Sequence, residues 1–326
     1  MIREKVLHEL EINRGKRISG GKLAKELGVS RAGVWKAISA LRSEGMDIVS
    51  VTGGGYMLND TDDTLTAQSI HALTKNKVIG NSILVFKEVT STNTVLRNEY
   101  SHNEHGFTVV AESQTAGKGR MGRKFISPDG GVYTSILLRP NITLEKIGFI
   151  TILTAVATCK AIERCCKISP KIKWVNDLLI DGKKVCGILT EASIEGETSN
   201  IEYVIVGIGV NVHTDISKMP EDIKCIAGSL SQFCDKTPRR AQIVSAILEE
   251  FEDGYNILCG ENGESEILKL YEERLCCINE TVEVYSASEK YDAVCKGINS
   301  AGNLIVEKAD GTLSALQSGE IRIRTK

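Results

Sequence analysis

A run of glycines and basic side chains between residues 111 and 124 is the part of this sequence best suited to bind an anion. Its glycines and cations alternate, in the order Gly117, Lys118, Gly119, Arg120, Gly122 and Arg123. Glycines let backbone N–H groups approach an anion closely and take positive φ angles, while the cations offset its charge. The run is not a Walker phosphate loop, because the Gly-Lys-Ser/Thr ending is missing. Taken alone, it is also typical of a surface loop or a nucleic-acid contact.

Four further patches carry groups that could complete such a site. Residues 89–93 (Val-Thr-Ser-Thr-Asn) place hydroxyls and an amide where a strand ends and a helix starts. Residues 173–177 (Lys-Trp-Val-Asn-Asp) combine a cation, an aromatic ring and an Asn–Asp pair able to bind magnesium. Residues 181–191 lead two lysines into an apolar strand, and residues 207–211 (Gly-Ile-Gly-Val-Asn) end a buried strand with small residues. Each patch alone is also typical of solvated side chains at a strand end.

The elements that must position these patches predict a mixed α/β domain over residues 63–275. Apolar runs indicate strands separated by turns, together with two long apolar helices. The expected strands cover residues 83–89, 108–111, 132–138, 185–189 and 203–210, and the expected helices cover 145–165 and 241–258. Apolar strands that alternate with helices predict a largely buried sheet.

Residues 1–62 show the pattern of a winged helix-turn-helix. Apolar residues repeat at helical spacing in three short segments, Ser19 and Ser30 are suited to cap the second and third helices, and Gly28 ends the second. Residues 48–58 then predict a two-stranded ribbon around a glycine triplet. The polar residues 59–64 predict a linker.

The third of these helices leaves one face available for DNA. That face carries Arg31, Ala32, Trp35, Lys36 and Arg42. A recognition helix in a major groove presents side chains in this way. Residues 1–60 hold ten Lys and Arg against seven Asp and Glu, so a dimer would be needed to build a useful electrostatic contact. The alternative is a small helical domain that contacts protein, with Trp35 as a core or interface aromatic.

Residues 276–326 predict a small third domain. Strand candidates at 281–285, 291–295, 304–307, 312–316 and 320–323 are separated by turns that contain Gly, Asn and Asp. Five short strands in so few residues favour a small β-barrel over an extension of the large sheet.

The composition argues against a membrane protein and against a protein that coats nucleic acid. The net charge is −2 and 42% of the residues are hydrophobic, so any contact with nucleic acid must be local. No stretch reaches 18 apolar residues and the N-terminus lacks a secretion signal, so we expect a cytoplasmic location. The ten cysteines show no Cys-x-x-Cys spacing, and we expect reduced, mostly buried thiols without a zinc site.

Together, the five patches resemble the biotin protein ligase family. The signature of that family is a Gly-Arg-Gly-Arg-x-Gly-Arg loop, a Lys-Trp-Pro-Asn-Asp segment, a Lys-x-x-Gly-Ile-Leu strand and a Gly-x-Gly-x-Asn strand. The flanking segments are similar to those of the bifunctional subclass, biotin–[acetyl-CoA-carboxylase] ligases that are also biotin operon repressors, so the resemblance covers essentially the whole chain. It implies a central sheet like that of class II synthetases and a C-terminal SH3-like barrel.

The resemblance implies a two-step reaction that uses ATP, Mg²⁺ and biotin. The biotin carboxylate attacks the α-phosphate of ATP to give biotinyl-5'-AMP and pyrophosphate. A lysine of the biotin carboxyl carrier protein, a subunit of acetyl-CoA carboxylase, then attacks the mixed anhydride and releases AMP. It also implies that biotinyl-AMP acts as a corepressor, ordering loops and promoting a homodimer that binds operator DNA and represses biotin genes.

The resemblance also implies a role for each matching residue. Biotin would be bound by Ser91, Thr92, Asn93, Gln114, Lys118, Gly119, Arg120 and Lys184. ATP would be bound by Arg123, Trp174, Asn176, Asp177, Asn211, Glu320 and Arg324. Lys184, Arg120 and Lys118 would be the catalytic cations, and Asp177 would bind the metal.

The chain departs from the family pattern at three positions, and three alternatives stay open. Lys118 stands in place of an arginine and loses bidentate geometry, Met121 replaces an arginine found in some members, and Val175 replaces a proline. The alternatives are a lipoate or octanoate ligase or transferase, a biotin-sensing repressor without ligase activity, and a ligase that no longer reads DNA. Lipoate and octanoate enzymes lack both the basic glycine loop and the helix-turn-helix.

Overall fold

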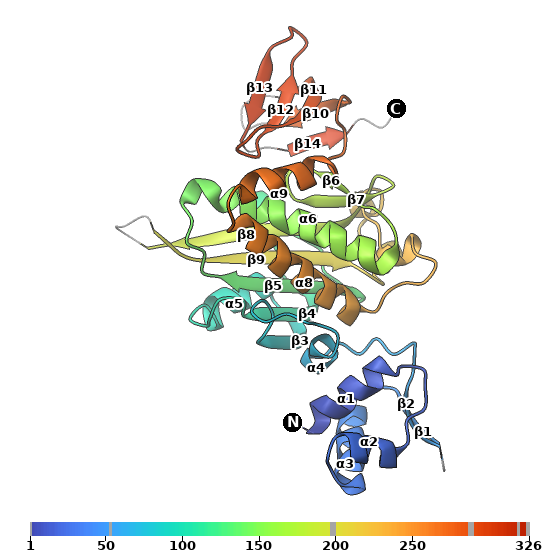
Figure 1. The fold of residues 1–326 in the computed structure, drawn as a ribbon. Coiled ribbons are helices and arrows are strands. Elements are labelled where there is room, and N and C mark those ends of the chain that lie inside the picture. The colour runs from blue at the N-terminus through green and yellow to red at the C-terminus, as the bar shows by residue number, and fades with distance from the viewer. Residues whose placement is uncertain (1, 52–53, 196–199, 286–289, 318–319, 324–326) are drawn as a thin grey trace. The chain divides into compact units, whose positions relative to one another are not determined.

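A computed structural model describes residues 2–51, 54–195, 200–285, 290–317 and 320–323 (Figure 1). The chain forms two compact units. The first consists of Met1–Lys75 and Pro238–Ser245, and the second of Asn76–Thr237 and Ala246–Lys326. The division into domains at residues 62 and 275 stays a prediction.

The first unit begins with three helices and a β-ribbon, as the sequence predicted, and a short fourth helix follows. The elements are α1 (Ile2–Ile12), α2 (Gly20–Glu26), α3 (Arg31–Ser43), β1 (Ile48–Val51), β2 (Gly55–Leu58) and the short α4 (Ala67–His71). Ser19 accepts a hydrogen bond from the Lys22 backbone N–H, and Ser30 accepts one from Gly33. These two caps satisfy N–H groups that a helix leaves unpaired at its start, which confirms both predicted N-caps.

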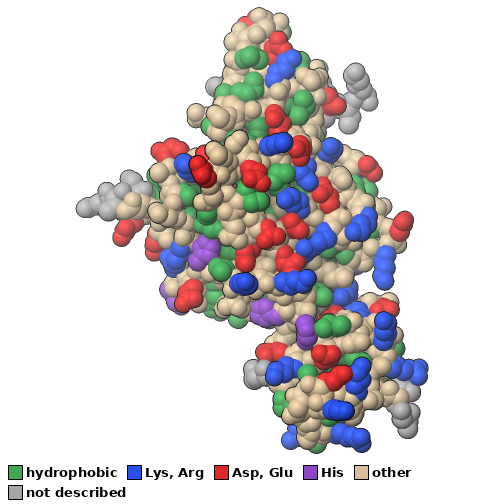
Figure 2. Space-filling model, in the orientation of Figure 1, with side chains coloured by type: hydrophobic (Ala, Val, Ile, Leu, Met, Phe, Trp, Pro, Cys, Tyr) green, Lys and Arg blue, Asp and Glu red, His purple; other side chains and the backbone are tan. Residues whose placement is uncertain are grey.

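The exposed face of α3 carries the side chains predicted to meet DNA. Residues 31, 32, 35, 36 and 42 are all exposed, and Trp35 is 59% exposed, so it is not a core aromatic. Arg42 also has a structural contact, because its guanidinium donates to the Ile48 carbonyl at 2.6 and 2.8 Å and to Ser50 Oγ at 2.6 Å. Figure 2 shows basic side chains interspersed with acidic ones on the visible face of this unit.

The segment expected to be a linker is held by hydrogen bonds. The Asn59 N–H donates to the Asp47 carbonyl, and the Thr64 hydroxyl donates to the carboxylate of Asp62, which is buried. Asp62 and its neighbours therefore belong to the packed first unit. The polar side chains of this segment form hydrogen bonds with the backbone, as in polar turns. Polar turns and linkers have similar compositions.

A buried carboxylate holds part of the first unit together. The Glu11 side chain is only 1% exposed, and both of its oxygens pair with Arg14 and with Arg239 at 2.8–3.1 Å. Asp63 similarly accepts from the Arg240 backbone and guanidinium at 2.6 Å. The segment Pro238–Ser245 is therefore attached to the N-terminal helices by charge-assisted hydrogen bonds.

A seven-stranded mixed sheet forms the centre of the second unit. Its order is β3-β4-β5-β9-β8-β7-β6, with β3 and β4 parallel and all other pairs antiparallel. The strands are β3 (Ile83–Val89), β4 (Thr108–Gln114), β5 (Gly131–Leu138), β6 (Lys171–Lys173), β7 (Asp177–Ile180), β8 (Lys183–Ile194) and β9 (Ile201–Asn211). The middle strands β5 and β9 are almost entirely buried, as continuous apolar runs predict.

Helices cover both faces of this sheet. Helix α6 (Ile147–Cys166), helix α9 (Gly263–Glu272) and the part of α8 (Arg240–Leu258) in this unit lie across one face (Figure 1). On that face the Thr151 hydroxyl of α6 donates to the Thr190 hydroxyl of β8. The neighbouring Glu191 contacts α5 (Thr92–Glu99) on the other face. Alternation of side chains along a strand produces this division.

Shorter elements connect the strands. They are the 3₁₀ turns η1 (Arg120–Gly122), η2 (Leu144–Lys146), η3 (Ile216–Lys218) and η4 (Leu230–Gln232) and the helix α7 (Glu221–Lys224). The sequence patterns did not predict the hairpin of β6 and β7 or helix α9. Both β6 and β7 are shorter than the windows in which strand periodicity is visible.

The C-terminal strands form a separate antiparallel sheet of order β13-β12-β11-β10-β14. They are β10 (Thr281–Tyr285), β11 (Lys290–Ile298), β12 (Leu304–Glu307), β13 (Leu313–Leu316) and β14 (Glu320–Ile323). The prediction of five short antiparallel strands is confirmed. None of the helices in the described part of the chain has the length and apolar character that a membrane crossing requires.

The ten cysteines are free thiols, and four of them are buried, namely Cys159, Cys186, Cys277 and Cys295, fewer than the expected majority. Burial raises the pKa of Cys159 to about 12 and that of Cys186 well above its ordinary value. Within the described residues, no group of three or more His, Cys, Asp or Glu side chains is arranged to hold a metal ion.

Replacing Glu11 by alanine should strongly destabilise the first unit. It would leave the largely buried Arg239 guanidinium without its Glu11 partner and Arg14 with only Asp62, at 3.8 Å. Breaking a buried pair in this way costs about 3–5 kcal/mol. Urea unfolding followed by Trp35 fluorescence in a Trp174→Phe background would measure the loss. Glu26→Ala is the control, because Glu26 pairs with Lys22 only at the surface and should change stability by less than about 1 kcal/mol. Equal effects of the two changes would contradict the prediction.

Candidate active site

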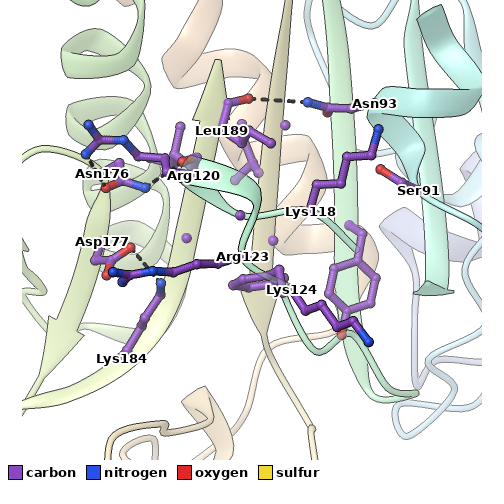
Figure 3. Close-up of a pocket in the computed structure, with 18 of the residues that line it drawn as sticks. Ser91, Asn93, Lys118, Arg120, Arg123, Lys124, Asn176, Asp177, Lys184 and Leu189 are labelled. Carbon is purple, nitrogen blue, oxygen red and sulfur yellow. Dashed lines mark hydrogen bonds and ion pairs between the residues drawn. The ribbon is translucent and has the colours of Figure 1, made fainter. Parts of the chain in front are cut away.

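One pocket of about 160 Å³ in the second unit brings together residues from all four of the patches and from the glycine run (Figure 3). Its lining includes Ser91, Thr92, Asn93, Gln114, Lys118, Gly119, Arg120, Arg123, Trp174, Asn176, Asp177, Lys184, Gly207 and Gly209. The sequence separates these residues widely, and the order of the strands in the sheet brings them together.

The glycine run folds back on itself as a narrow loop beside the pocket. The Gly119 N–H donates to the Arg123 carbonyl at 2.7 Å, and the Phe125 N–H donates to the Gly117 carbonyl at 2.9 Å. A Cβ on Gly117 would lie 2.3 Å from the Phe125 oxygen, so this position requires glycine. Met121 takes a positive φ of 54°, an uncommon angle for a residue with a side chain.

Cations and one carboxylate converge at one end of the pocket. Lys184 Nζ lies 2.7 Å from Asp177 Oδ1, and Arg120 donates to Asn176 Oδ1 at 3.4 Å. Asn176 is itself fixed, because its amide donates to the Ile188 carbonyl at 2.7 Å. Figure 3 shows these four side chains gathered on one side of the pocket, with Asn93 and Ser91 on the other. The single carboxylate leaves net positive charge here, which suits an anionic ligand.

Hydroxyl and amide groups form the opposite end. Gln114 Oε1 accepts the Thr92 N–H at 2.8 Å, and the Asn93 amide donates to Glu191 Oε2 at 2.7 Å. Ser91 is buried at the start of α5, but its side chain makes no capping hydrogen bond. Buried polar groups need partners, so this end is suited to a ligand that carries several hydrogen-bonding atoms.

Glycines in the two central strands let Phe125 lie against the sheet. Gly187 of β8 is paired directly with Gly209 of β9. Added Cβ atoms there would lie 2.8 and 2.5 Å from the Phe125 ring. Lys184 Nζ lies 5.5 Å from the centre of the same ring. Phe125 was not among the predicted site residues, although it follows the basic run directly.

A second cavity of about 100 Å³ shares Lys124, Phe125 and Lys184 with the first. Its other lining residues are Ile126, Cys186, Asn211, Met219, Ile223, Ile226 and Ala227. Asn211 is buried, and its amide donates to the Gly228 carbonyl at 2.9 Å while Oδ1 has no hydrogen-bond partner. Asn211 therefore offers a buried acceptor to this largely apolar cavity.

Two hydrogen bonds hold the turn between β6 and β7 beside the pocket. The Trp174 indole N–H donates to the Gly302 carbonyl at 3.1 Å, and the Tyr271 hydroxyl donates to the Val175 carbonyl at 3.1 Å. Helix α9 and the C-terminal sheet therefore support the turn that carries Asp177. Trp174 lines the first cavity and not the second, and its predicted role in binding ATP stays a prediction.

Two further predicted site residues, Glu320 and Arg324, lie near the end of the chain. Glu320 begins β14, opposite Tyr285 of β10, and Arg324 lies outside the described residues. Their roles stay predictions. Sequence reasoning also missed Ser135 and Glu191, which lie behind the pocket. Glu191 ends the lysine-containing patch, but nothing in its spacing pointed to Asn93.

A segment of each unit matches the model of a known protein family. Residues 85–211 match the model of the Biotin/lipoate A/B protein ligase family, and residues 2–57 match that of an HTH domain. The bifunctional ligase/repressor BirA of Bacillus subtilis is 36% identical over 309 residues, which cover 94% of each chain. The chain belongs to the bifunctional ligase/repressor family.

Other members agree with this ligase/repressor assignment. The bifunctional ligase/repressor BirA of Escherichia coli is 27% identical over 308 residues, or 94% of this chain and 93% of that one. Among solved structures, a biotin protein ligase from Aquifex aeolicus in complex with biotin and ATP is 27% identical with a TM-score of 0.65. The match covers 76% of this chain and 100% of that chain. The ligase/repressor fold predicted from the sequence is confirmed.

Gly209→Ala should destabilise this ligase/repressor chain. The new methyl group would displace the Phe125 ring, and overpacking of this kind costs about 1–3 kcal/mol. The matched control is Gly148→Ala in α6, where an added Cβ meets nothing within 4 Å and should be neutral or stabilising by up to about 1 kcal/mol. Urea unfolding of both variants measures the difference. A Gly209→Ala variant as stable as the control would argue against close contact of Phe125 with the sheet.

Proposed function

We propose that this protein is an ATP-dependent biotin protein ligase that also represses transcription. It forms biotinyl-5'-AMP from biotin and ATP and then transfers biotin to a lysine of a carrier protein. The observation that carries the proposal is that Lys118, Arg120 and Lys184 line one pocket together with the hydroxyls and amides of Ser91, Thr92, Asn93 and Gln114. Membership of the ligase/repressor family supports it.

The two ends of the pocket match the two ends of biotin. The ring system lies against Ser91, Thr92, Asn93 and Gln114, where buried polar groups can pair with its ureido atoms. The carboxylate extends toward Lys118, Gly119 and Arg120. Because the carboxylate and the α-phosphate of ATP repel each other, the cations must offset that repulsion before a bond can form.

Lys184 is the cation placed to stabilise the reacting phosphate. Its ammonium group is held 2.7 Å from Asp177 and 29% of its side chain is exposed, so it is accessible from the pocket. As the carboxylate oxygen attacks the α-phosphorus, Lys184 and Arg120 balance the charge that builds on the phosphate oxygens. Arg123 supports the loop.

The second cavity is suited to the adenine of ATP. Its walls are largely apolar, and the Asn211 Oδ1 acceptor can receive a hydrogen from an exocyclic amino group. Adenine carries such a group and guanine carries it at a different position. Asn211 would therefore bind the adenine base. Lys184 lines both cavities and would lie close to the phosphates.

The residues present fit magnesium bound mainly by phosphate. Mg²⁺ usually takes one or two carboxylates plus substrate phosphates and keeps several waters. Asp177, with Asn176 beside it, supplies one carboxylate at the cationic end of the pocket. Bound there, magnesium would offset phosphate charge. Asp177 also orients Lys184.

Transfer and repression complete the proposal. The acceptor is a biotin carboxyl carrier protein, whose lysine attacks the biotinyl anhydride once the pocket has excluded water. The first unit binds operator DNA through the exposed face of α3. Biotinyl-AMP promotes a homodimer, which would double the modest positive charge that one unit offers to DNA.

Lys184→Ala should abolish most adenylation while leaving biotin binding largely intact. The change removes a charge used in the transition state, so kcat should fall by about 10²–10³-fold, while the KM for biotin should change little. Pyrophosphate exchange measures kcat, and calorimetry measures biotin binding. Lys171→Ala, at an exposed position of β6 outside the pocket, is the control. If kcat fell by less than about tenfold, Lys184 would not be a catalytic residue.

The same exchange assay, run with biotin, lipoate and octanoate, separates the alternatives. Exchange with biotin alone is expected. Exchange with lipoate or octanoate instead would overturn the substrate assignment. Tight binding of biotin without exchange would identify a sensor that has lost catalysis.

Lys36→Ala should weaken operator binding without changing sequence preference. If Lys36 meets a phosphate, the slope of log K against log salt should fall by about 0.9. Lys5→Ala, at an exposed position of α1, should leave both affinity and slope unchanged. Fluorescence anisotropy over a salt series measures both quantities. Equal effects of the two changes would show that the face of α3 is not the DNA contact.

A further inference from the structure

Residues 216–228 form one wall of the second cavity. Four side chains of this segment line the cavity, namely Met219, Ile223, Ile226 and Ala227. All of them except Ile226 also belong to a small apolar cluster of the same segment, together with Ile216. A cluster of this size buries little apolar surface, and a segment with few buried apolar contacts is held weakly. Polar contacts with the rest of the unit must therefore help to fix this wall.

Three hydrogen bonds fasten the wall to the first two residues of β8. The Lys183 ammonium group donates to the Cys225 carbonyl at 2.7 Å. The Lys184 N–H donates to the Ile226 carbonyl at 2.7 Å, and the Lys184 carbonyl accepts the Gly228 N–H at 2.9 Å. The Lys184 side chain points instead to Asp177 in the first cavity (Figure 3). Of the three bonds, only that of Lys183 uses a side chain, so a substitution can remove it and leave the backbone bonds in place.

The Cys225 carbonyl is a suitable acceptor for a cation. Cys225 is the C-cap residue of α7, and carbonyls at the end of a helix lack helical partners and carry partial negative charge. A lysine that donates to such a carbonyl makes a charge-assisted hydrogen bond. Lys183 itself lines neither cavity. Its contact with the wall is therefore the route by which it can affect a bound ligand.

Gly228 links the same wall to Asn211. Its carbonyl accepts the Asn211 amide at 2.9 Å, while its N–H pairs with Lys184. Because a carbonyl only accepts, Asn211 directs its NH₂ group to Gly228, and Oδ1 is left without a partner in the described part of the chain. A Cβ on Gly228 would lie 2.8 Å from the Lys183 Cβ, so a side chain here would push the wall away from β8. The position of the wall and the direction of the Asn211 acceptor are therefore coupled.

We propose that Lys183 is a positioning residue that holds residues 216–228 against β8 and thereby raises the affinity of the second cavity for the adenine of ATP. This rests on the proposed function, which assigns adenine to that cavity. Lys183 does not touch the nucleotide and acts through the Cys225 carbonyl.

Lys183→Met should weaken ATP binding and leave biotin binding unchanged. Methionine keeps an unbranched apolar stem but cannot donate, so the wall loosens and the nucleotide must order it on binding. The KM for ATP should rise about tenfold. The kcat and the KM for biotin should stay within about twofold of wild type, because the groups of the first cavity are untouched. Pyrophosphate exchange measures all three quantities.

Two further measurements separate positioning from a general loss of stability. Lys183→Arg keeps a long cationic donor and should return the KM for ATP to within about threefold of wild type. Hydrogen exchange of the ligand-free protein, followed by mass spectrometry, should be faster in Lys183→Met for peptides that cover residues 219–231. Peptides of β5 should exchange as in wild type, whereas a general loss of stability would speed exchange in both regions.

Lys218→Met is the matched control. Lys218 lies in the same segment, its side chain is 83% exposed and it pairs only with the nearby Asp215, at 3.3 Å. This variant loses the same charge without releasing the wall, so its KM for ATP should equal that of wild type. Equal rises in the two variants would show an effect of charge alone and would refute the positioning role.

The proposal also fails if Lys183→Met leaves the KM for ATP within about twofold of wild type, if the KM for biotin rises by the same factor, or if exchange of residues 219–231 is unchanged. If Lys183→Met does not fold, Lys183→Gln replaces it with the same expectations, because its amide is too short to reach the Cys225 carbonyl. Absence of any pyrophosphate exchange with biotin in the wild type would instead refute the proposed function. Hydrogen exchange would then still decide whether Lys183 holds the wall.

Discussion

The close approach of Phe125 and Asn93 to glycines of the two central strands is the contact on which the pocket depends. Gly187 and Gly209, paired across β8 and β9, leave room for the Phe125 ring, and Gly207 leaves room for the Asn93 amide, which an added Cβ would meet at 2.3 Å. The basic loop is anchored through Phe125, and helix α5 through Asn93. Small residues in a buried sheet therefore bring two polar segments onto one surface.

Charge is distributed over this surface in a way that suits an anionic reaction. Lys184 is paired with Asp177, and Arg120 contacts the neutral Asn176, so the cationic end keeps an excess of positive charge. Glu191 sits at the polar end, where its charge is balanced by Arg97. Lys118 also attracts Glu191 electrostatically, so the two ends of the pocket differ in their balance of charge. The two ends can then recognise chemically different parts of one ligand.

Much of the fold could be predicted from local sequence signals. Both N-caps of the first unit were identified because a serine before an apolar helix has a specific physical role. The strands β3 and β10 were predicted with their observed bounds, since apolar runs between turn residues mark strands. The hairpin of β6 and β7 was missed because it is too short for periodicity. The hydrogen bonds of the segment near Asp62 could not be predicted, because polar turns and linkers share a composition, and its role as a linker stays a prediction.

The sequence by itself determined which chemical groups the site has: the basic glycine loop, the hydroxyls and amide of residues 91–93, and the glycines that let a ligand approach. Tertiary structure decided what each group does. It placed Asn211 in the second cavity, used the Arg42 guanidinium to hold the Ile48 carbonyl, and brought Glu191 to Asn93 across 98 residues of chain. Local propensities act over a few residues, whereas hydrogen-bond partners depend on which strands pair and which helices pack on them. The residue types of the site can therefore be read from the sequence, but their hydrogen-bond partners cannot.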